Sequence, residues 1–223
     1  MKNQALDSII LFDLGNTLVY RDKSHEDFDV ELIGDLLQKK SSDIKPVLDK
    51  WSVKFPGIYS FQFDNQYCRT LGKERKYNET FFQKVFTELK NPKMLPVFLE
   101  KRSAQIRYNL YPETLKYLQC LTKTYILGIA TNGRPSRRLV MKQLGIADYF
   151  NPEMIFISDE IGKAKPERSF YLYVMKKLPD MKKMILGDDE VINLLIAKQC
   201  GWETLKIDHK KNGFAVFKDI IDL

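Results

Sequence analysis

Five short apolar runs constrain the fold of this chain more than any other feature of its sequence. They occupy residues 8–13, 124–131, 153–158, 183–188 and 203–207, and the first runs without alternation of apolar and polar side chains. Strands of this kind are usually buried on both faces, as in parallel sheets that are covered by helices. We therefore expect these runs to form the strands of one central parallel sheet.

Helical patterns precede each of the last four runs, at residues 112–123, 135–145, 166–178 and 189–201. Several of these segments begin with Pro or Asp and end near Gly, which are preferred at the starts and ends of helices. Alternation of strand and helix along a chain predicts a doubly wound α/β fold with a parallel sheet. Ligands of such sheets bind at the carboxyl ends of the strands.

The region between the first and second runs has a different character. Residues 20–108 contain no strong strand run, are rich in aromatic side chains and carry several helix-like segments. We predict an α-helical domain over residues 20–108, inserted into an α/β core made of residues 1–19 and 109–223. A chain of 223 residues is long enough for one sizeable core and a smaller second domain.

Charge and composition favour a small anionic ligand over a nucleic acid or a membrane. The net charge is +7, but Lys and Arg are spread along the chain without a run of five, and residues 22–35 lean acidic. This distribution suits attraction of phosphate esters better than a nucleic-acid footprint; the alternative is a Lys-rich surface that aids solubility. No apolar run approaches the roughly 18 residues of a membrane span.

The termini and cysteines point to a cytoplasmic location. The first residues, MKNQALDSIILF, lack the pattern of a secretory signal peptide. Cys68, Cys120 and Cys200 are scattered and odd in number, so we expect reduced thiols.

Polar groups follow the predicted strands and should converge at one edge of the sheet. They are Asp13, the turn Thr131-Asn132-Gly133, Lys163 and Lys165 after the third strand, and the pair Asp188-Asp189. Carboxylates that face each other need a cation, and Mg²⁺ prefers such oxygen ligands. A carboxylate beside Mg²⁺ can attack phosphorus to form an aspartyl phosphate, while the hydroxyl, amide and lysine hold the phosphoryl oxygens. The glycine turn would bring backbone N–H groups close to the phosphate.

Four segments in chain order resemble the signature motifs of the haloacid dehalogenase superfamily. They are FDLGNTL, IATNG, GKAKPERSFY and ILGDDEVINLLIAKQCG. The resemblance implies a Rossmann-like core with a helical cap at the place of the insertion. It also implies a small phosphorylated substrate and the following roles: catalysis by Asp13, Thr131 and Lys165; phosphate binding by Thr131, Asn132, Gly133 and Lys165; and Mg²⁺ binding by Asp13, the Gly15 carbonyl, Asp188 and Asp189. Lys165 is preferred to Lys163 because Pro166 follows it, and Asp189 remains divided between a metal ligand and a helix cap.

Two positions depart from the family pattern. Phosphatases of the family usually carry a second Asp at the place of Gly15, which acts as general acid and base, a contribution of roughly 10²–10⁴-fold. Its loss favours leaving groups that depart unaided, such as anomeric, acyl and aryl phosphates. A second acid of the fourth motif is replaced by Asn193, which predicts weaker Mg²⁺ binding.

Three interpretations of the activity stay open. The first is a Mg²⁺-dependent phosphatase, the second a metal-free hydrolase similar to the 2-haloacid dehalogenases, and the third a degenerate member that binds a ligand without useful catalysis. The dehalogenases normally carry an aromatic residue at the place of Gly15.

Other charged and titratable residues are assigned less specific roles. His25 and His209 have no partner at metal or triad spacing, so we expect both at the surface. The segment 68–78 carries Arg69, Lys73, Arg75 and Lys76, and it either reaches the substrate or forms a solvated helix and loop.

Overall fold

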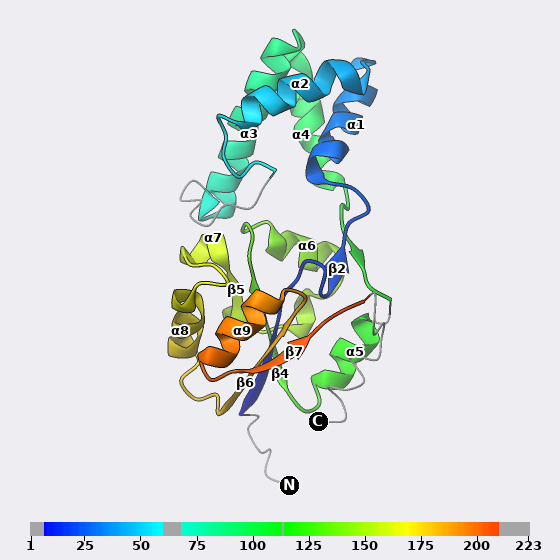
Figure 1. Cartoon of the computed structure of the whole chain (residues 1–223). Helices are drawn as coiled ribbons and strands as arrows, with labels where there is room; N and C mark the ends of the chain where they lie inside the picture. The colour runs from blue at the N-terminus through cyan, green and yellow to red at the C-terminus, as the bar shows by residue number, and fades with distance from the viewer. Residues whose placement is uncertain (1–6, 60–67, 113, 210–223) are drawn as a thin grey trace.

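The computed structural model of the chain describes residues 7–59, 68–112 and 114–209 (Figure 1). Its centre is a five-stranded sheet in the order β5-β4-β1-β6-β7, and every neighbouring pair of strands is parallel. The strands are β1 (Ser8–Phe12), β4 (Ile126–Thr131), β5 (Ile155–Ile157), β6 (Lys183–Asp188) and β7 (Glu203–Lys206). The predicted doubly wound parallel fold is therefore confirmed, and each apolar run contains one strand.

Helices cover both faces of this sheet, which explains why the interiors of its central strands are apolar. Ile10 and Phe12 of β1 face the cluster that includes side chains of α5 (Thr114–Leu121) and α6 (Arg137–Gln143). Ile9 and Leu11 face the opposite cluster, with α8 (Arg168–Lys177) and α9 (Val191–Gln199). Because successive strand residues point to opposite faces, a strand covered on both sides is apolar at every position.

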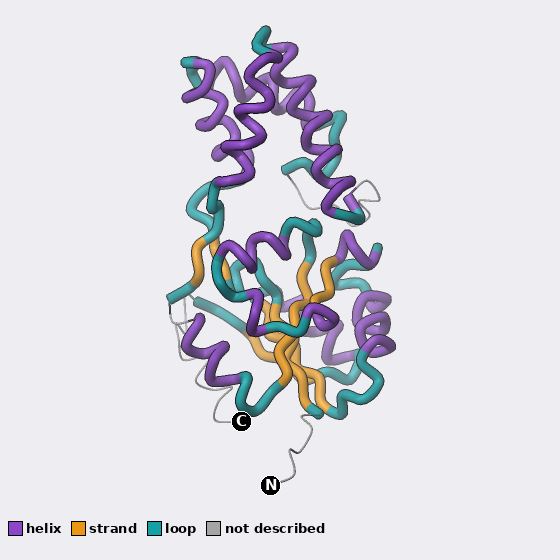
Figure 2. The backbone as a smooth tube through the Cα atoms, turned by 180° about the vertical axis from the view of Figure 1, so that it is seen from behind, coloured by secondary structure: helices purple, strands orange, loops and turns teal. Residues whose placement is uncertain are grey.

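Four helices form a separate bundle above the sheet, which we call the helical domain (Figure 2). They are α1 (His25–Leu37), α2 (Ser41–Ser52), α3 (Leu71–Glu88) and α4 (Leu95–Ala104), with the short 3₁₀ helix η2 (Pro92–Met94) before α4. Their shared core combines aliphatic and aromatic side chains, and Phe81, Phe82 and Phe98 are completely buried there. This separate core accounts for the aromatic-rich composition of the region.

The chain passes between the helical domain and the core through a small antiparallel sheet. Strand β2 (Val19–Tyr20) pairs with β3 (Asn109–Leu110); the boundary expected at 19/20 lies inside β2, and the one expected at 108/109 lies directly before β3. Strands of two residues carry no periodic pattern, which is why the sequence did not indicate them. The remaining short elements lie in the core: η3 (Ala147–Tyr149), η4 (Pro152–Met154) and α7 (Ser158–Ile161).

All three cysteines are free of disulfides, and Cys68 is buried. Among the helices of the described residues, none has both the length and the apolar character required to cross a membrane.

Candidate functional site

The carboxyl ends of three neighbouring strands bring the predicted site residues together. Strand β1 lies between β4 and β6, so Asp13, which follows β1, has the end of each neighbour beside it (Figure 1). Thr131 ends β4 and Asp188 ends β6, and both side chains are buried. The backbone N–H of Asp13 donates to the carbonyl of Gly187 at 2.8 Å, which carries the pairing of β1 and β6 as far as the site.

Lys165 lies between two carboxylates. Its Nζ is 2.8 Å from Oδ1 of Asp13 and 2.5 Å from Oδ2 of Asp188, and the residue is 1% exposed. Burial alone would lower the pKa of Lys165, but the two negative charges more than offset this effect, so its pKa is raised above the usual value. The lysine is therefore a fixed positive charge, and of the two lysines that the sequence offered, Lys165 reaches the carboxylates.

Asp188 is held in place by the start of α9. Its Oδ1 accepts from the backbone N–H of Glu190 at 2.8 Å, and both of its oxygens accept from Nδ2 of Asn193 at 3.1 Å. The amide nitrogen of Asn193, rather than its carbonyl oxygen, thus faces the site. Asn193 orients Asp188 here, and Asp188 makes the hydrogen bond at the helix start.

Asp189 does not cap helix α9. The N-cap residue of α9 is Glu190, and Oδ1 of Asp189 instead accepts a hydrogen bond of 3.4 Å from the hydroxyl of Thr17. Burial, followed by the charges of Asp13, Asp188 and Glu190, raises the pKa of Asp189 to about 6. Thr17 is completely buried and was missed by the sequence analysis.

The carboxylates of the site outnumber its resident cation. Burial raises the pKa of Asp13, the charge of Asp188 raises it further, and Lys165 and Arg137 oppose the shift. Carboxylate and carbonyl oxygens are suitable ligands for Mg²⁺, and the excess negative charge fits a divalent cation. Within the described residues, no three carboxylate, histidine or cysteine side chains converge into a complete metal site. An ion here would complete its shell with the Gly15 carbonyl, water or phosphoryl oxygens, which is usual for Mg²⁺.

The turn after β4 is joined to the lysine loop. Nδ2 of Asn132 donates to the carbonyl of Lys165 at 2.7 Å, and the N–H of Lys165 donates to Oδ1 of Asn132 at 2.9 Å. The N–H of Gly133 donates to the hydroxyl of Ser158 at 2.9 Å. Asn132 and Gly133, predicted to bind phosphate, thus also tie the two loops together, while the Thr131 hydroxyl makes a long contact of 3.4 Å to the Asn132 carbonyl.

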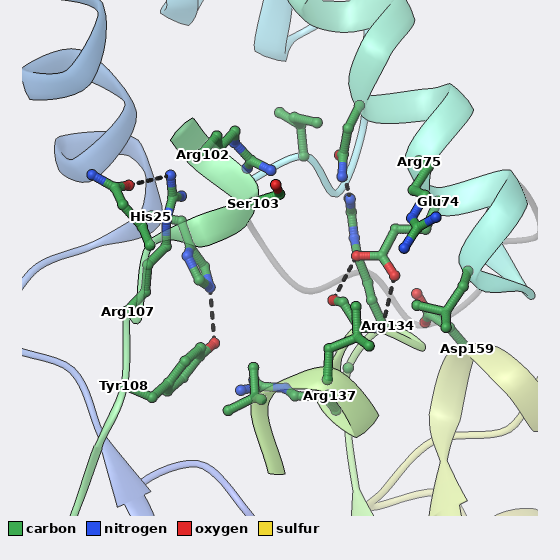
Figure 3. Close-up of a pocket in the computed structure, with 18 of the residues that line it drawn as sticks. His25, Glu74, Arg75, Arg102, Ser103, Arg107, Tyr108, Arg134, Arg137 and Asp159 are labelled. Carbon is green, nitrogen blue, oxygen red and sulfur yellow. Dashed lines mark hydrogen bonds between the residues drawn. The ribbon is translucent and has the colours of Figure 1, made fainter. Parts of the chain in front are cut away.

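A cavity of about 380 Å³ lies between the helical domain and the core, beside Asn132 and Gly133 (Figure 3). The helical domain contributes side chains of α1, α3, α4 and the loop around Gly57, and the core contributes α6 and the turn before it. Arginine is its dominant charged residue: Arg21, Arg75, Arg102, Arg107, Arg134 and Arg137.

Both histidines lie in more enclosed positions than the sequence predicted. His25 lines this cavity, and its Nε2 is 2.8 Å from the hydroxyl of Tyr108, 83 residues away in the chain. His209 is stacked on Tyr111 with ring centroids 3.4 Å apart, and its Nε2 is 2.9 Å from the Thr17 carbonyl. The prediction of surface positions was wrong because these partners are far away in the sequence.

The segment 68–78 meets the core through an acid. Glu74 is buried and accepts hydrogen bonds from the N–H of Ser136 at 2.8 Å and from its hydroxyl at 2.6 Å. Arg69, Lys73, Arg75 and Lys76 are all exposed, and of these four Arg75 lines the cavity. Of the basic residues considered in this segment, Arg75 is thus placed to meet a ligand, and the contact of Glu74 was missed.

Comparisons with known proteins bear on the family and the fold of the chain. The family model for haloacid dehalogenase-like hydrolases matches residues 8–201. A search of curated proteins found no significant match. The haloacid dehalogenase family enzyme bt-2542 from Bacteroides thetaiotaomicron, solved with magnesium and inorganic phosphate, has 19% identity and a TM-score of 0.60, over 90% of this chain and 94% of that chain.

Two further solved structures share the fold. One is a phosphatase of this family from Thermococcus onnurineus, with 22% identity and a TM-score of 0.52, over 92% of this chain and 87% of that one. The other is the L-2-haloacid dehalogenase PA0810, with 19% identity and a TM-score of 0.52, over 90% and 84% of the two chains. At these identities the similarity shows the fold and nothing finer.

Proposed function

This chain belongs to the haloacid dehalogenase-like hydrolase family, and we propose that it is a Mg²⁺-dependent phosphatase that acts on a small phosphorylated metabolite. The observation that carries the proposal is the charge at the sheet edge. Burial, followed by the charges of Asp13 and Asp188, raises the pKa of Asp189 to about 6, and Lys165 is buried between Asp13 and Asp188. A phosphatase that recruits a divalent cation uses this excess of negative charge.

Asp13 supplies the nucleophile in this mechanism. Lys165 bonds Oδ1, so Oδ2 attacks the phosphorus. A bond forms between Oδ2 and phosphorus while the bond from phosphorus to the leaving oxygen breaks, which gives an aspartyl phosphate. Water then attacks the phosphorus, the bond between Oδ2 and phosphorus breaks, and the proton of the water leaves with the inorganic phosphate, which restores the carboxylate of Asp13. A bound Mg²⁺ would neutralise the charge on the phosphoryl oxygens.

Lys165 and Asn193 position the groups that react. Lys165 holds Asp13 and Asp188 at fixed separation and adds a buried positive charge, and such charges stabilise a phosphoryl transition state. Asn193 fixes the carboxylate of Asp188. The Thr131 hydroxyl and the turn that follows it would contact the phosphoryl oxygens.

Gly15 supplies no proton to the leaving group. We therefore expect aryl, acyl or anomeric phosphates as substrates, because their leaving groups depart without protonation. A metal-free dehalogenase and a non-catalytic binding protein are the competing outcomes.

The test measures turnover of p-nitrophenyl phosphate and a panel of phosphorylated metabolites, with Mg²⁺ and with a chelator. We expect Mg²⁺-dependent phosphate release, reduced by about 10³-fold or more in Asp13→Asn. Asp180→Asn, an exposed aspartate, serves as the control. Halide release from a 2-haloacid without metal would support the dehalogenase, and a well-folded protein without any turnover would refute catalysis.

A further inference from the structure

We infer that the cavity between the helical domain and the core binds a second anionic group of the substrate, either a carboxylate or another phosphate. This inference rests on the proposed function, because it takes the first anionic group to be the phosphoryl group at Asp13. It names the class of leaving group that the enzyme accepts.

The charges that line the cavity are unbalanced. Asp29 accepts from Nε of Arg102 at 2.9 Å and from Nη2 of Arg107 at 2.7 Å, so one carboxylate serves two guanidinium groups. The other lining arginines, Arg21, Arg75, Arg134 and Arg137, form no ion pair within the part of the chain that the structure describes. Arg134 instead donates to Asn78 at 3.1 Å and to the carbonyl of Gly57. The acids of the lining, Glu74 and Asp159, are fewer than its arginines.

Arg137 connects the cavity with the catalytic loops. A side chain at position 15 would begin 4.0 Å from Nη2 of Arg137, and a Cβ at position 133 would lie 2.8 Å from its Nε. The guanidinium also lies 5.0 Å from the centre of the Tyr108 ring, on the cavity wall (Figure 3). Gly133 thus leaves room for this arginine, whereas a Cβ at position 15 would make only an ordinary contact with it.

Two arginines that line this cavity have hydrogen-bond donors without an acceptor among the described residues. Nη1 of Arg137 and Nε of Arg107 are buried and have no hydrogen-bond partner among the described residues. A buried charged donor without a partner is costly, and a ligand carboxylate or phosphate removes that cost by accepting its hydrogen bond. The fork of an arginine matches the paired oxygens of both groups.

His25 reports the electrostatic character of the same space. Burial lowers its pKa, and the charges of Arg21, Arg107, Arg137 and Arg102 lower it further, to about 2. The imidazole is therefore neutral and bonds to Tyr108 at 2.8 Å. The four arginine charges that contribute to this shift repel cationic ligands from the cavity and attract anionic ones.

The dimensions of the cavity suit a small molecule. Its volume of about 380 Å³ lies within the usual range for ligand pockets, and it borders Asn132 and Gly133, next to the expected phosphoryl position. A phosphate ester whose leaving group carries a carboxylate or phosphate would place one anion at Asp13 and the other among the arginines.

The test compares binding of matched compounds that cannot be hydrolysed. Isothermal titration calorimetry, with and without Mg²⁺, measures methylphosphonate, 3-phosphonopropionate and 1,3-propylenediphosphonate against the wild type, Arg137→Gln and Lys142→Gln. Lys142 is an exposed lysine on the same helix, so its variant controls for the loss of one positive charge. The two probes that carry a second anionic group, 3-phosphonopropionate and 1,3-propylenediphosphonate, distinguish a carboxylate from a phosphate as that group.

We expect the wild type to bind at least one of the probes with two anionic groups about tenfold or more tighter than methylphosphonate. Arg137→Gln should weaken that probe by about 10- to 100-fold, the range of a charged hydrogen bond, while Lys142→Gln retains the preference. Arg21→Gln, an exposed change on the cavity rim, provides a second variant if Arg137→Gln unfolds. Equal affinity for all probes, no binding, or a preference that survives the cavity variants would overturn the inference.

Turnover separates this result from the proposed function. Selective binding of a probe with two anionic groups, without hydrolysis of any phosphate ester, would support the second anion site and refute the phosphatase activity. Hydrolysis of phosphate esters without preference for a second anionic group would support the phosphatase activity and overturn the second anion site.

Discussion

Replacing Lys165 with methionine tests whether one buried cation holds the site together. The side chain volumes are similar, so the change removes the charge and leaves the packing largely intact. Lys165 is 1% exposed and its Nζ lies within 2.8 Å of oxygens from both Asp13 and Asp188. In Lys165→Met these two carboxylates face each other without their shared cation.

The expected cost follows from that arrangement. Two unit charges roughly 5 Å apart repel by about 3 kcal/mol at an effective dielectric constant near 20. This value agrees with the loss of roughly 3–5 kcal/mol that is typical when one partner of a buried ion pair is removed. Lys163→Met, two residues away on a half-buried side chain, should change the free energy of unfolding by less than about 0.5 kcal/mol.

The cost in Lys165→Met should also depend on pH. Without Lys165, the pKa of Asp13, which is already above the ordinary value of 3.8, rises further, so the folded state takes up a proton more readily than the unfolded chain. Stability of this variant, relative to the wild type, is then lowest at neutral pH and recovers as the pH falls through the raised pKa. Each pH unit recovers at most about 1.4 kcal/mol.

Urea unfolding followed by circular dichroism measures these quantities for the wild type and both variants at about pH 8 and about pH 5.5, without metal. We expect a large loss for Lys165→Met at the higher pH, a smaller one at the lower pH, and partial rescue by Mg²⁺. Equal small losses for both lysines, or a loss for Lys165→Met that ignores pH, would refute the electrostatic argument.

Three further predictions concern the neighbourhood of the site. Gly15→Asp should fold with a stability within about 0.5 kcal/mol of the wild type, because the positive φ of this turn belongs to Asn16 and the nearest atom to an added Cβ is 4.0 Å away; thermal unfolding measures this, and a large loss would contradict the backbone geometry. The wild type should lose kcat/KM steeply from aryl to alkyl phosphates, and Gly15→Asp should flatten that series by restoring up to about 10²-fold or more on the alkyl esters. The pKa of His25 is about 2 in the folded protein and 6.5 ordinarily, so the unfolded chain takes up the proton first, and the free energy of unfolding falls below pH 6.5, by about 2 kcal/mol near pH 5. His25→Gln should lose about that much less stability on acidification, and parallel pH profiles of stability for the two proteins would exclude a buried, neutral His25.

The sequence by itself determined the sheet and the group at its edge. Unbroken apolar runs specify strands that are covered on both faces, and the helices between them force those strands to run parallel. Parallel strands end at one edge, so Asp13 and Asp188 were expected at that edge, and the strand order of the structure places them on neighbouring strands, β1 and β6. Lys165 joins them because its loop follows β5, which ends at the same edge.

The tertiary structure alone decided how the helical domain meets that edge. His25 bonds Tyr108 across 83 residues, and Glu74 bonds Ser136 across 62 residues. Arg137, on a helix whose sequence is ordinary, comes to lie against Gly133 because the backbone there leaves space for it. Such contacts depend on how two separately packed cores are oriented. Local periodicity carries no information about that orientation, since it records which side of an element is buried and not what lies across the gap.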